Sequence, residues 1–133
     1  MRSAAPFHFT MRLTELEPQF ERYESRPSEP GGSPCEYLRH VETLADAQGI
    51  VFLCPVCFTK NGGAVGTHGI EVSFADRGVL DHQGSHNKEG KPSRWAAAGT
   101  GYADLTLLPS ILCDPAKPAC DGWHGFITNG EVK

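Results

Sequence analysis

The sequence has no long run of apolar residues. None of its hydrophobic stretches approaches the roughly 20 consecutive apolar residues that a membrane-spanning helix needs. Its start, residues 1–10, is also too short and too polar to serve as a secretory signal. We therefore predict a cytoplasmic protein without membrane association.

An excess of positive charge is absent as well. The 133 residues include 12 Lys and Arg against 16 Asp and Glu, which gives a formal net charge of −4 at pH 7. A protein that binds nucleic acid normally presents a basic face to the phosphates. We therefore expect no nucleic-acid partner.

The common signatures of catalytic sites are missing too. The glycine-rich stretch 61–66 lacks the Lys-Ser/Thr pair and the following helix pattern of a phosphate-binding loop. A Gly-x-Ser-x-Gly elbow and a His-Glu-x-x-His helix do not occur. Ser110 is a conceivable nucleophile only because it lies between a predicted strand at 105–108 and the cysteines that follow it.

The chain also lacks an even number of cysteines. It has five, so a full set of disulfides would leave one thiol unpaired. In a reducing cytoplasm, thiols stay free or bind metal. The odd count and the missing signal therefore favour metal binding over disulfides.

What the sequence does contain is a pair of metal-binding arms. A Cys-Pro-Val-Cys motif at residues 54–57 places two thiolates on one side of a tight turn. A second arm near the end of the chain carries Cys120 and His124, four positions apart. Zn²⁺ in structural sites is held by four such ligands in a tetrahedron. We therefore predict a Zn²⁺ site with Cys54, Cys57, Cys120 and His124 as ligands.

Other cysteines and histidines leave alternatives open. Cys113 competes with Cys120, and a four-thiolate site from Cys54, Cys57, Cys113 and Cys120 is an alternative. Cys35, isolated in a proline-rich segment, is interpreted as incidental.

Three further histidines are interpreted as loop residues. His68 follows a glycine-rich stretch. It would lie near the Cys-x-x-Cys turn at 54–57 and at most contact the ligands there, without binding the metal itself. His82 and His86 are four apart beside a carboxylate, which on a helix would suit a second metal site. Glycines at 78 and 84 disfavour a helix there, so solvated side chains are the favoured interpretation.

Period-two alternation predicts a mainly β fold, α+β at most, built as a small antiparallel sheet with at most one or two short helices. Asn129-Gly130 lies between apolar runs and predicts a C-terminal β-hairpin. Residues 36–48 fit either a helix or a strand at 38–42 followed by a turn. Residues 58–66 and 75–93 read as loops, since glycine and polar residues dominate them. The predicted strands are 11–16, 19–24, 50–53, 69–74, 95–99, 105–108 and 123–127.

The length supports one domain with a modest core. Patterned sequence begins at Met11, so we predict an N-terminal extension at 1–10 and a single zinc-stapled domain at 11–133.

Four segments carry a resemblance to a known family. They are residues 11–18 (Met-Arg-Leu-Thr-Glu-Leu-Glu-Pro), 52–57 (Phe-Leu-Cys-Pro-Val-Cys), 107–111 (Leu-Leu-Pro-Ser-Ile) and 123–132 (Trp-His-Gly-Phe-Ile-Thr-Asn-Gly-Glu-Val). In this order they resemble a family of small bacterial and phage proteins catalogued as domain of unknown function 6527. The resemblance spans residues 11–133.

The resemblance implies a small, mostly β domain with a Cys/His metal centre, and it supplies no activity. Family members usually carry a Cys two residues before the terminal His, whereas three residues separate Cys120 from His124 here. Some relatives lie in bacterial operons with ubiquitin-like proteins and their activating enzymes, and many others resemble phage genes.

Two functions from different classes follow. The favoured one is a non-enzymatic accessory protein, phage or bacterial, whose zinc is structural and which acts through a protein partner. Its binding surface is expected in the loops 61–68 or 75–93. The alternative is a zinc-dependent or zinc-stabilised hydrolase or peptidase of ubiquitin-like conjugates. That alternative would use a three-ligand zinc with water, lined by Asp81, His82 or Asp104.

Overall fold

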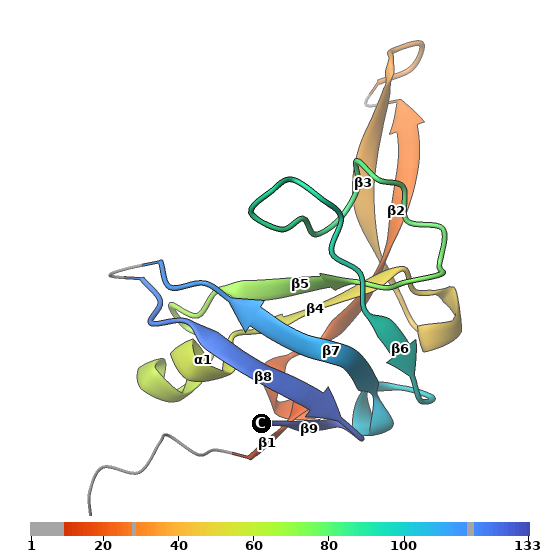
Figure 1. The fold of residues 1–133 in the computed structure, drawn as a ribbon. Coiled ribbons are helices and arrows are strands. Elements are labelled where there is room, and N and C mark those ends of the chain that lie inside the picture. Colours follow the sequence, from red (N-terminus) through yellow and green to blue (C-terminus); the bar gives the residue numbers. More distant parts are fainter. Residues whose placement is uncertain (1–9, 28, 117–118) are drawn as a thin grey trace, which may run out of the picture.

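The computed structural model describes residues 10–27, 29–116 and 119–133. Within these ranges the chain forms two antiparallel β-sheets and one α-helix (Figure 1). The prediction of a mainly β fold with at most one or two short helices is confirmed. Residues 1–9 of the predicted extension lie outside the described residues. No helix in the described part is long and apolar enough to cross a membrane.

The first sheet has four strands in the order β3-β2-β4-β5. They are β2 (Gln19–Pro27), β3 (Pro34–Val41), β4 (Gly49–Leu53) and β5 (Gly69–Ser73). The apolar run predicted as a strand is β4, which buries Ile50 and Phe52 in the core. β5 runs antiparallel to β4 with Leu53 opposite Gly69. The residue after β4 and the residue before β5 therefore lie next to each other.

The second sheet has five strands in the order β1-β9-β8-β7-β6. They are β1 (Met11–Arg12), β6 (Ala96–Ala98), β7 (Thr106–Cys113), β8 (Trp123–Thr128) and β9 (Glu131–Val132). β8 alternates strictly, with Trp123, Gly125 and Ile127 buried and the residues between them exposed. This alternation follows from strand geometry, since successive side chains point to opposite faces. It fixes which residues of the C-terminal segment can reach the interior.

The C-terminal hairpin forms where the sequence predicts it. Asn129 and Gly130 connect β8 to β9 with φ of 49° and 77°. Both values are left-handed, as a two-residue turn with the twist of a hairpin requires. A side chain at Gly130 would also collide with the carbonyl oxygen of Ala103. Glycine is therefore needed here for conformation and for space.

The two sheets share one hydrophobic core. Phe52 of β4 meets Trp123 of β8 edge to face, with ring centroids 6.1 Å apart. Phe20 of β2 stacks on Tyr102 at 4.2 Å. Burying a large apolar side chain contributes about 1.5–3 kcal/mol. The same core cluster contains Cys54, Cys57 and Cys120, so these thiols belong to the interior of the fold.

The predicted strand at 11–16 is only partly a strand. Only its first two residues, Met11–Arg12, form a strand, β1. The next four, Leu13–Leu16, form a 3-10 helix, η1. Leu13 and Leu16 are both fully buried. Because side chains three apart fall on one side of a 3-10 helix, this turn buries both leucines at once. Alternation over so few residues cannot distinguish the two arrangements.

The segment after Cys54 was expected to be a turn followed by loop, and this is wrong. Residues Pro55–Asn61 form α1, with Cys54 at the N-cap and Gly62 in the left-handed conformation at the C-cap. Proline is favoured in the first turn because its missing N–H is not needed there. Glycine ends helices because it adopts positive φ without strain. The helix is only seven residues long, too short to show a clear period.

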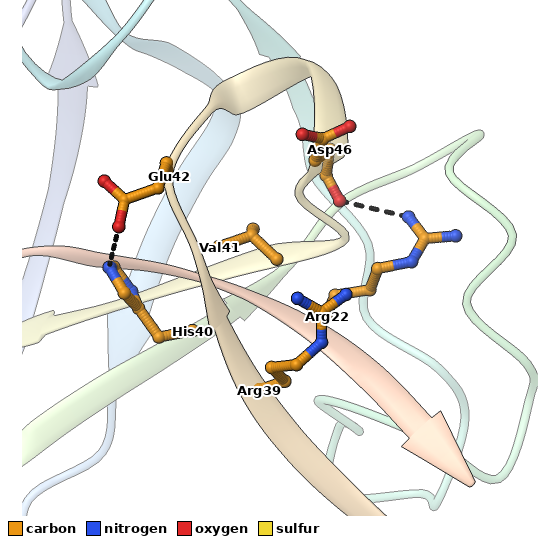
Figure 2. Close-up of a pocket in the computed structure, with 6 residues that line it drawn as sticks. All are labelled: Arg22, Arg39, His40, Val41, Glu42 and Asp46. Atoms are coloured by element: carbon orange, nitrogen blue, oxygen red, sulfur yellow. Dashed lines mark hydrogen bonds and ion pairs between the residues drawn. The ribbon is translucent and has the colours of Figure 1, made fainter.

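The ambiguous segment 36–48 resolves in favour of the strand. β3 pairs with β2 along its whole length, and the two form a ribbon that projects from the body (Figure 1). At its base, Arg22 and Arg39 are directly paired across the strands (Figure 2). Arg22 donates a hydrogen bond to the carbonyl of Asp46 at 3.0 Å. Asp46 belongs to a second 3-10 helix, η2 (Leu44–Asp46), so this contact ties the ribbon to the body.

The long polar segment 75–93 lacks regular strands or helices but is held at several points. The guanidinium of Arg94 donates to the carbonyls of Leu80, Gln83 and Ser85 at 2.8–2.9 Å. A charged donor bonded to several carbonyls stabilises more than neutral bonds do. The segment therefore presents a defined surface over β5.

A third 3-10 helix, η3 (Tyr102–Asp104), connects β6 to β7.

Candidate metal centre

Four side chains converge where the two sheets meet. Cys54, Cys57, His68 and Cys120 each offer one ligand atom, and these atoms all lie within 4.8 Å of one another. The sulfurs of Cys54 and Cys120 are 4.0 Å apart. Two thiolates bound to one tetrahedral Zn²⁺ at ~2.3 Å would be ~3.8 Å apart. The spacing therefore fits a single metal ion.

β4 and α1 position the first two cysteines. Cys54 is the N-cap of α1, directly after β4, and Cys57 lies in the first turn of the helix. Both are buried, at 0% and 2% exposure. Side chains three apart on a helix lie on the same face, so both sulfurs point to the same side.

His68 is positioned by the pairing of β4 with β5. The amide of Cys54 donates to the carbonyl of His68 at 2.9 Å, which continues the ladder by one residue. One ring nitrogen, Nδ1, lies 3.2 Å from the carbonyl of Gly69. The other, Nε2, is buried and has no hydrogen-bond partner among the described residues. When Nδ1–H donates to a carbonyl, Nε2 carries the free lone pair, which is how metal-binding histidines are oriented.

The loop between β7 and β8 supplies the remaining member of the group, Cys120. Cys120 is 2% exposed and forms a two-hydrogen-bond bridge with Ala116, at 2.9 and 2.8 Å. The amide of Gly122 donates to its sulfur at 3.3 Å. These bonds fix the thiol against the end of β4, 66 residues earlier in the chain.

The structure places His124 elsewhere. Of the four predicted ligands it brings together Cys54, Cys57 and Cys120, and His68 occupies the fourth position. His124 lies on β8 directly after the buried Trp123, so strand alternation turns it to the exposed face. There its Nε2 lies 2.9 Å from the hydroxyl of Ser110. The sequence interpretation of His68 as a residue behind the ligands missed this convergence.

The surroundings affect the thiols differently. Burial raises the pKa of Cys54 and raises that of Cys57 to about 12. Burial also acts to raise the pKa of Cys120, but the Gly122 amide, His68 and the two other thiols together lower it to about 7. A bound cation would favour the thiolate form of all three, because metal binding displaces the protons.

The other candidate ligands lie outside the group. Cys113 is half-buried beside it, where burial, then the charges of Cys120 and Cys54, raise its pKa to about 11. Cys35 is exposed on β3.

A second metal site at His82 and His86, which the sequence disfavoured, does not form within the described residues, where no second group of metal-binding side chains converges. His82 pairs instead with Glu36 at 2.6 Å. The ring nitrogens of His86 contact the carbonyls of Asp81 and Gly84.

Comparisons with known proteins add no relative: no family model, curated protein or solved structure matches the chain. The case for a metal centre therefore rests on the geometry of its four side chains.

Proposed function

We propose that Cys54, Cys57, His68 and Cys120 bind one structural Zn²⁺, and that the protein is a small zinc-stabilised accessory domain acting through a protein partner. The convergence of three buried thiols and one buried imidazole nitrogen, which has no hydrogen-bond partner in the described part of the chain, supports this proposal. Three sulfurs and one nitrogen are the ligand types that Zn²⁺ prefers in structural sites. In the setting that the family resemblance implies, the protein acts in a bacterial cytoplasm, encoded by the bacterium or a phage.

The role proposed for zinc follows from what its ligands connect. They come from the junction of β4 and α1, from the residue directly before β5 and from the loop between β7 and β8. One ion would therefore join both sheets and link positions 54 and 120. Binding free energy at such a site adds directly to folding free energy, because the unfolded chain has no preformed site.

Four protein ligands favour a structural over a hydrolytic zinc. A hydrolytic zinc keeps a position for water, usually with three protein ligands. Two of the three side chains that the hydrolase hypothesis placed beside the zinc, His82 and Asp104, are engaged elsewhere. His82 pairs with Glu36, and the carboxylate of Asp104 accepts hydrogen bonds from the amides of Thr100 and Gly101.

The loop 75–93 is the surface we assign to the partner. Arg94 holds it in one arrangement, and a pre-organised loop loses less entropy on binding than a floppy one. Leu80 is exposed on this loop, as Val65 is on the other long loop, 61–68. A substitution of either side chain by Asp therefore changes the apolar surface of one loop without touching the core.

Cobalt substitution tests the metal proposal. Purified protein refolded with Co²⁺ is expected to show the intense visible bands of a tetrahedral site and thiolate-to-metal charge transfer. Addition of one equivalent of Zn²⁺ should abolish both signals. Octahedral spectra, or no binding, would overturn the proposal.

Paired baits test the partner proposal. The zinc-loaded wild type, Leu80→Asp and Val65→Asp are each used to capture proteins from a bacterial extract. We expect a specific protein to be retained by the wild type and lost with Leu80→Asp, while Val65→Asp retains it. Equal zinc content and Tm of the three baits control for folding. Identical captured sets from all three baits would contradict the assignment of this loop.

A further inference from the structure

The outer face of β7 and β8 carries a hydroxyl and an imidazole in contact. The Oγ of Ser110 lies 2.9 Å from the Nε2 of His124. Both side chains lie away from the core, and His124 is exposed. This is the distance at which an imidazole takes the proton of a serine nucleophile. We propose that Ser110 and His124 form a nucleophilic site that attacks acyl compounds, namely esters or amides with an apolar group next to the carbonyl.

An irregularity in β7 gives Ser110 its position. Leu107 pairs with Ile127, and Ile111 pairs with Gly125, so four steps along β7 correspond to two along β8. The extra residues form a bulge that contains Ser110. Bulges redirect side chains and are common beside active sites. The indole of Trp95 donates to the Ser110 carbonyl at 3.1 Å and holds the bulge in place.

The surroundings of the pair supply room and apolar surface. Ser110 lines a depression between β7 and the loop 85–93, together with Trp95 and Leu112. Leu112 pairs with His124 across the strands and is 60% exposed. Phe126, two residues beyond His124 on the same face, is 51% exposed. Large apolar side chains exposed around a polar pair are a typical surface for an apolar substrate group.

The chemistry follows from the hydrogen bond. The Ser110 oxygen forms a bond to the carbonyl carbon while its proton moves to Nε2 of His124. The bond to the leaving group then breaks, and the leaving group takes that proton. Water attacks the acyl-serine in the same way, with His124 again as base, and releases the acid and free Ser110. No oxidant or metal is needed, so the inference is independent of the proposed zinc function.

The pair lacks a third member. Among the residues that the structure describes, no carboxylate is hydrogen-bonded to Nδ1 of His124. Disabling the orienting carboxylate in a serine triad costs about 10⁴ in kcat. We therefore expect slow turnover, and a reagent that reports nucleophilic attack directly is the better test.

An alkyl fluorophosphonate is such a reagent. Serine oxygen attacks its phosphorus, fluoride leaves, and the proton passes to the base. Incubated with the zinc-loaded full chain, it should add one phosphonyl group, which peptide mapping should place on Ser110. Ser110→Ala should abolish the label, and His124→Ala should slow labelling about 100-fold, as loss of a general base does. His40→Ala, which changes an exposed histidine on another strand, should label like the wild type.

Two outcomes would overturn the inference. One is the absence of label on Ser110 at reagent concentrations that mark known serine hydrolases. The other is equal labelling rates for the wild type and His124→Ala. Both residues lie at the surface, so zinc content and Tm should be unchanged and loss of label cannot be ascribed to unfolding. Leu112→Ser should slow labelling by a long-chain reagent several-fold, and equal rates would refute the apolar-substrate part.

Discussion

The amide of Cys54 and the carbonyl of His68 form a hydrogen bond of 2.9 Å, and this bond brings two side chains of the candidate metal centre together. It is the first backbone contact beyond the paired ends of β4 and β5. The fourth ligand position is thus determined by strand pairing within the first sheet. Cys120 comes from the loop that connects β7 and β8 of the second sheet.

The first prediction compares the two histidines. His68→Ala should lower zinc affinity and the free energy of unfolding by at least ~3 kcal/mol, a fall in Tm of about 10 °C. His124→Ala should leave both unchanged, because its ring lies on the exposed face beside Ser110. Zinc titration and thermal melts measure both. If His124→Ala loses zinc and His68→Ala keeps it, the site is the one expected from sequence.

The second prediction concerns the contribution of the metal to folding. Zinc binding at structural sites is worth about 10–16 kcal/mol, which is comparable with the whole stability of a domain. Cys57→Ser should therefore leave the chain largely unfolded at 37 °C, and a strong chelator should do the same to the wild type. Circular dichroism during chelation follows the effect. Cys35→Ser is the matched control, since Cys35 is exposed on β3. A stably folded Cys57→Ser protein would refute a structural role.

The third prediction distinguishes His68 from Cys113 as the fourth ligand. Cys113 lies beside the group, and a four-thiolate site was the alternative from sequence. Cys113→Ser should retain about one zinc per chain, because three cysteines and His68 complete the tetrahedron without it. The Co²⁺ charge-transfer intensity should stay that of three thiolates in both proteins. A lower intensity in Cys113→Ser would show that Cys113 is a ligand.

The parts of the site that depend on a few neighbouring residues could be predicted from the sequence, and the parts that depend on strand pairing were missed. The Cys54 and Cys57 pair, and the Asn129-Gly130 hairpin, are set by a few neighbouring residues. His68 is brought to the site by the register of β4 and β5. That signal was present, because two predicted strands at 50–53 and 69–74, paired as a hairpin, place residues 54 and 68 opposite each other. His124 was misplaced because side-chain alternation after Trp123 was not applied.

Two features of the fold had weak local signals. The bulge that positions Ser110 depends on pairing with β8, so the sequence predicted only a short strand at 105–108, before Pro109. The helix α1 was missed because glycines directly after it suggested a loop, although a proline such as Pro55 at the first helical position is a helix-start signal.

The last prediction concerns pH and Glu21. Burial and then the charge of Glu71 raise the pKa of Glu21 from 4.5 to about 7. The folded state therefore binds a proton at Glu21 more tightly than the unfolded state does. The protonated carboxyl stabilises the folded protein fully below pH 4.5, and this contribution is lost as the pH rises towards 7. Because the side chain is half-exposed, solvent screening reduces the effect to about 1 kcal/mol. The Tm of the wild type should fall by about 3–5 °C between pH 5 and pH 8 from this source. Glu21→Gln should remove that part of the decline and be more stable than the wild type at pH 8, while differing little at pH 5. If the Tm of the two proteins changes equally with pH across this range, the proposed rise in the pKa of Glu21 is refuted.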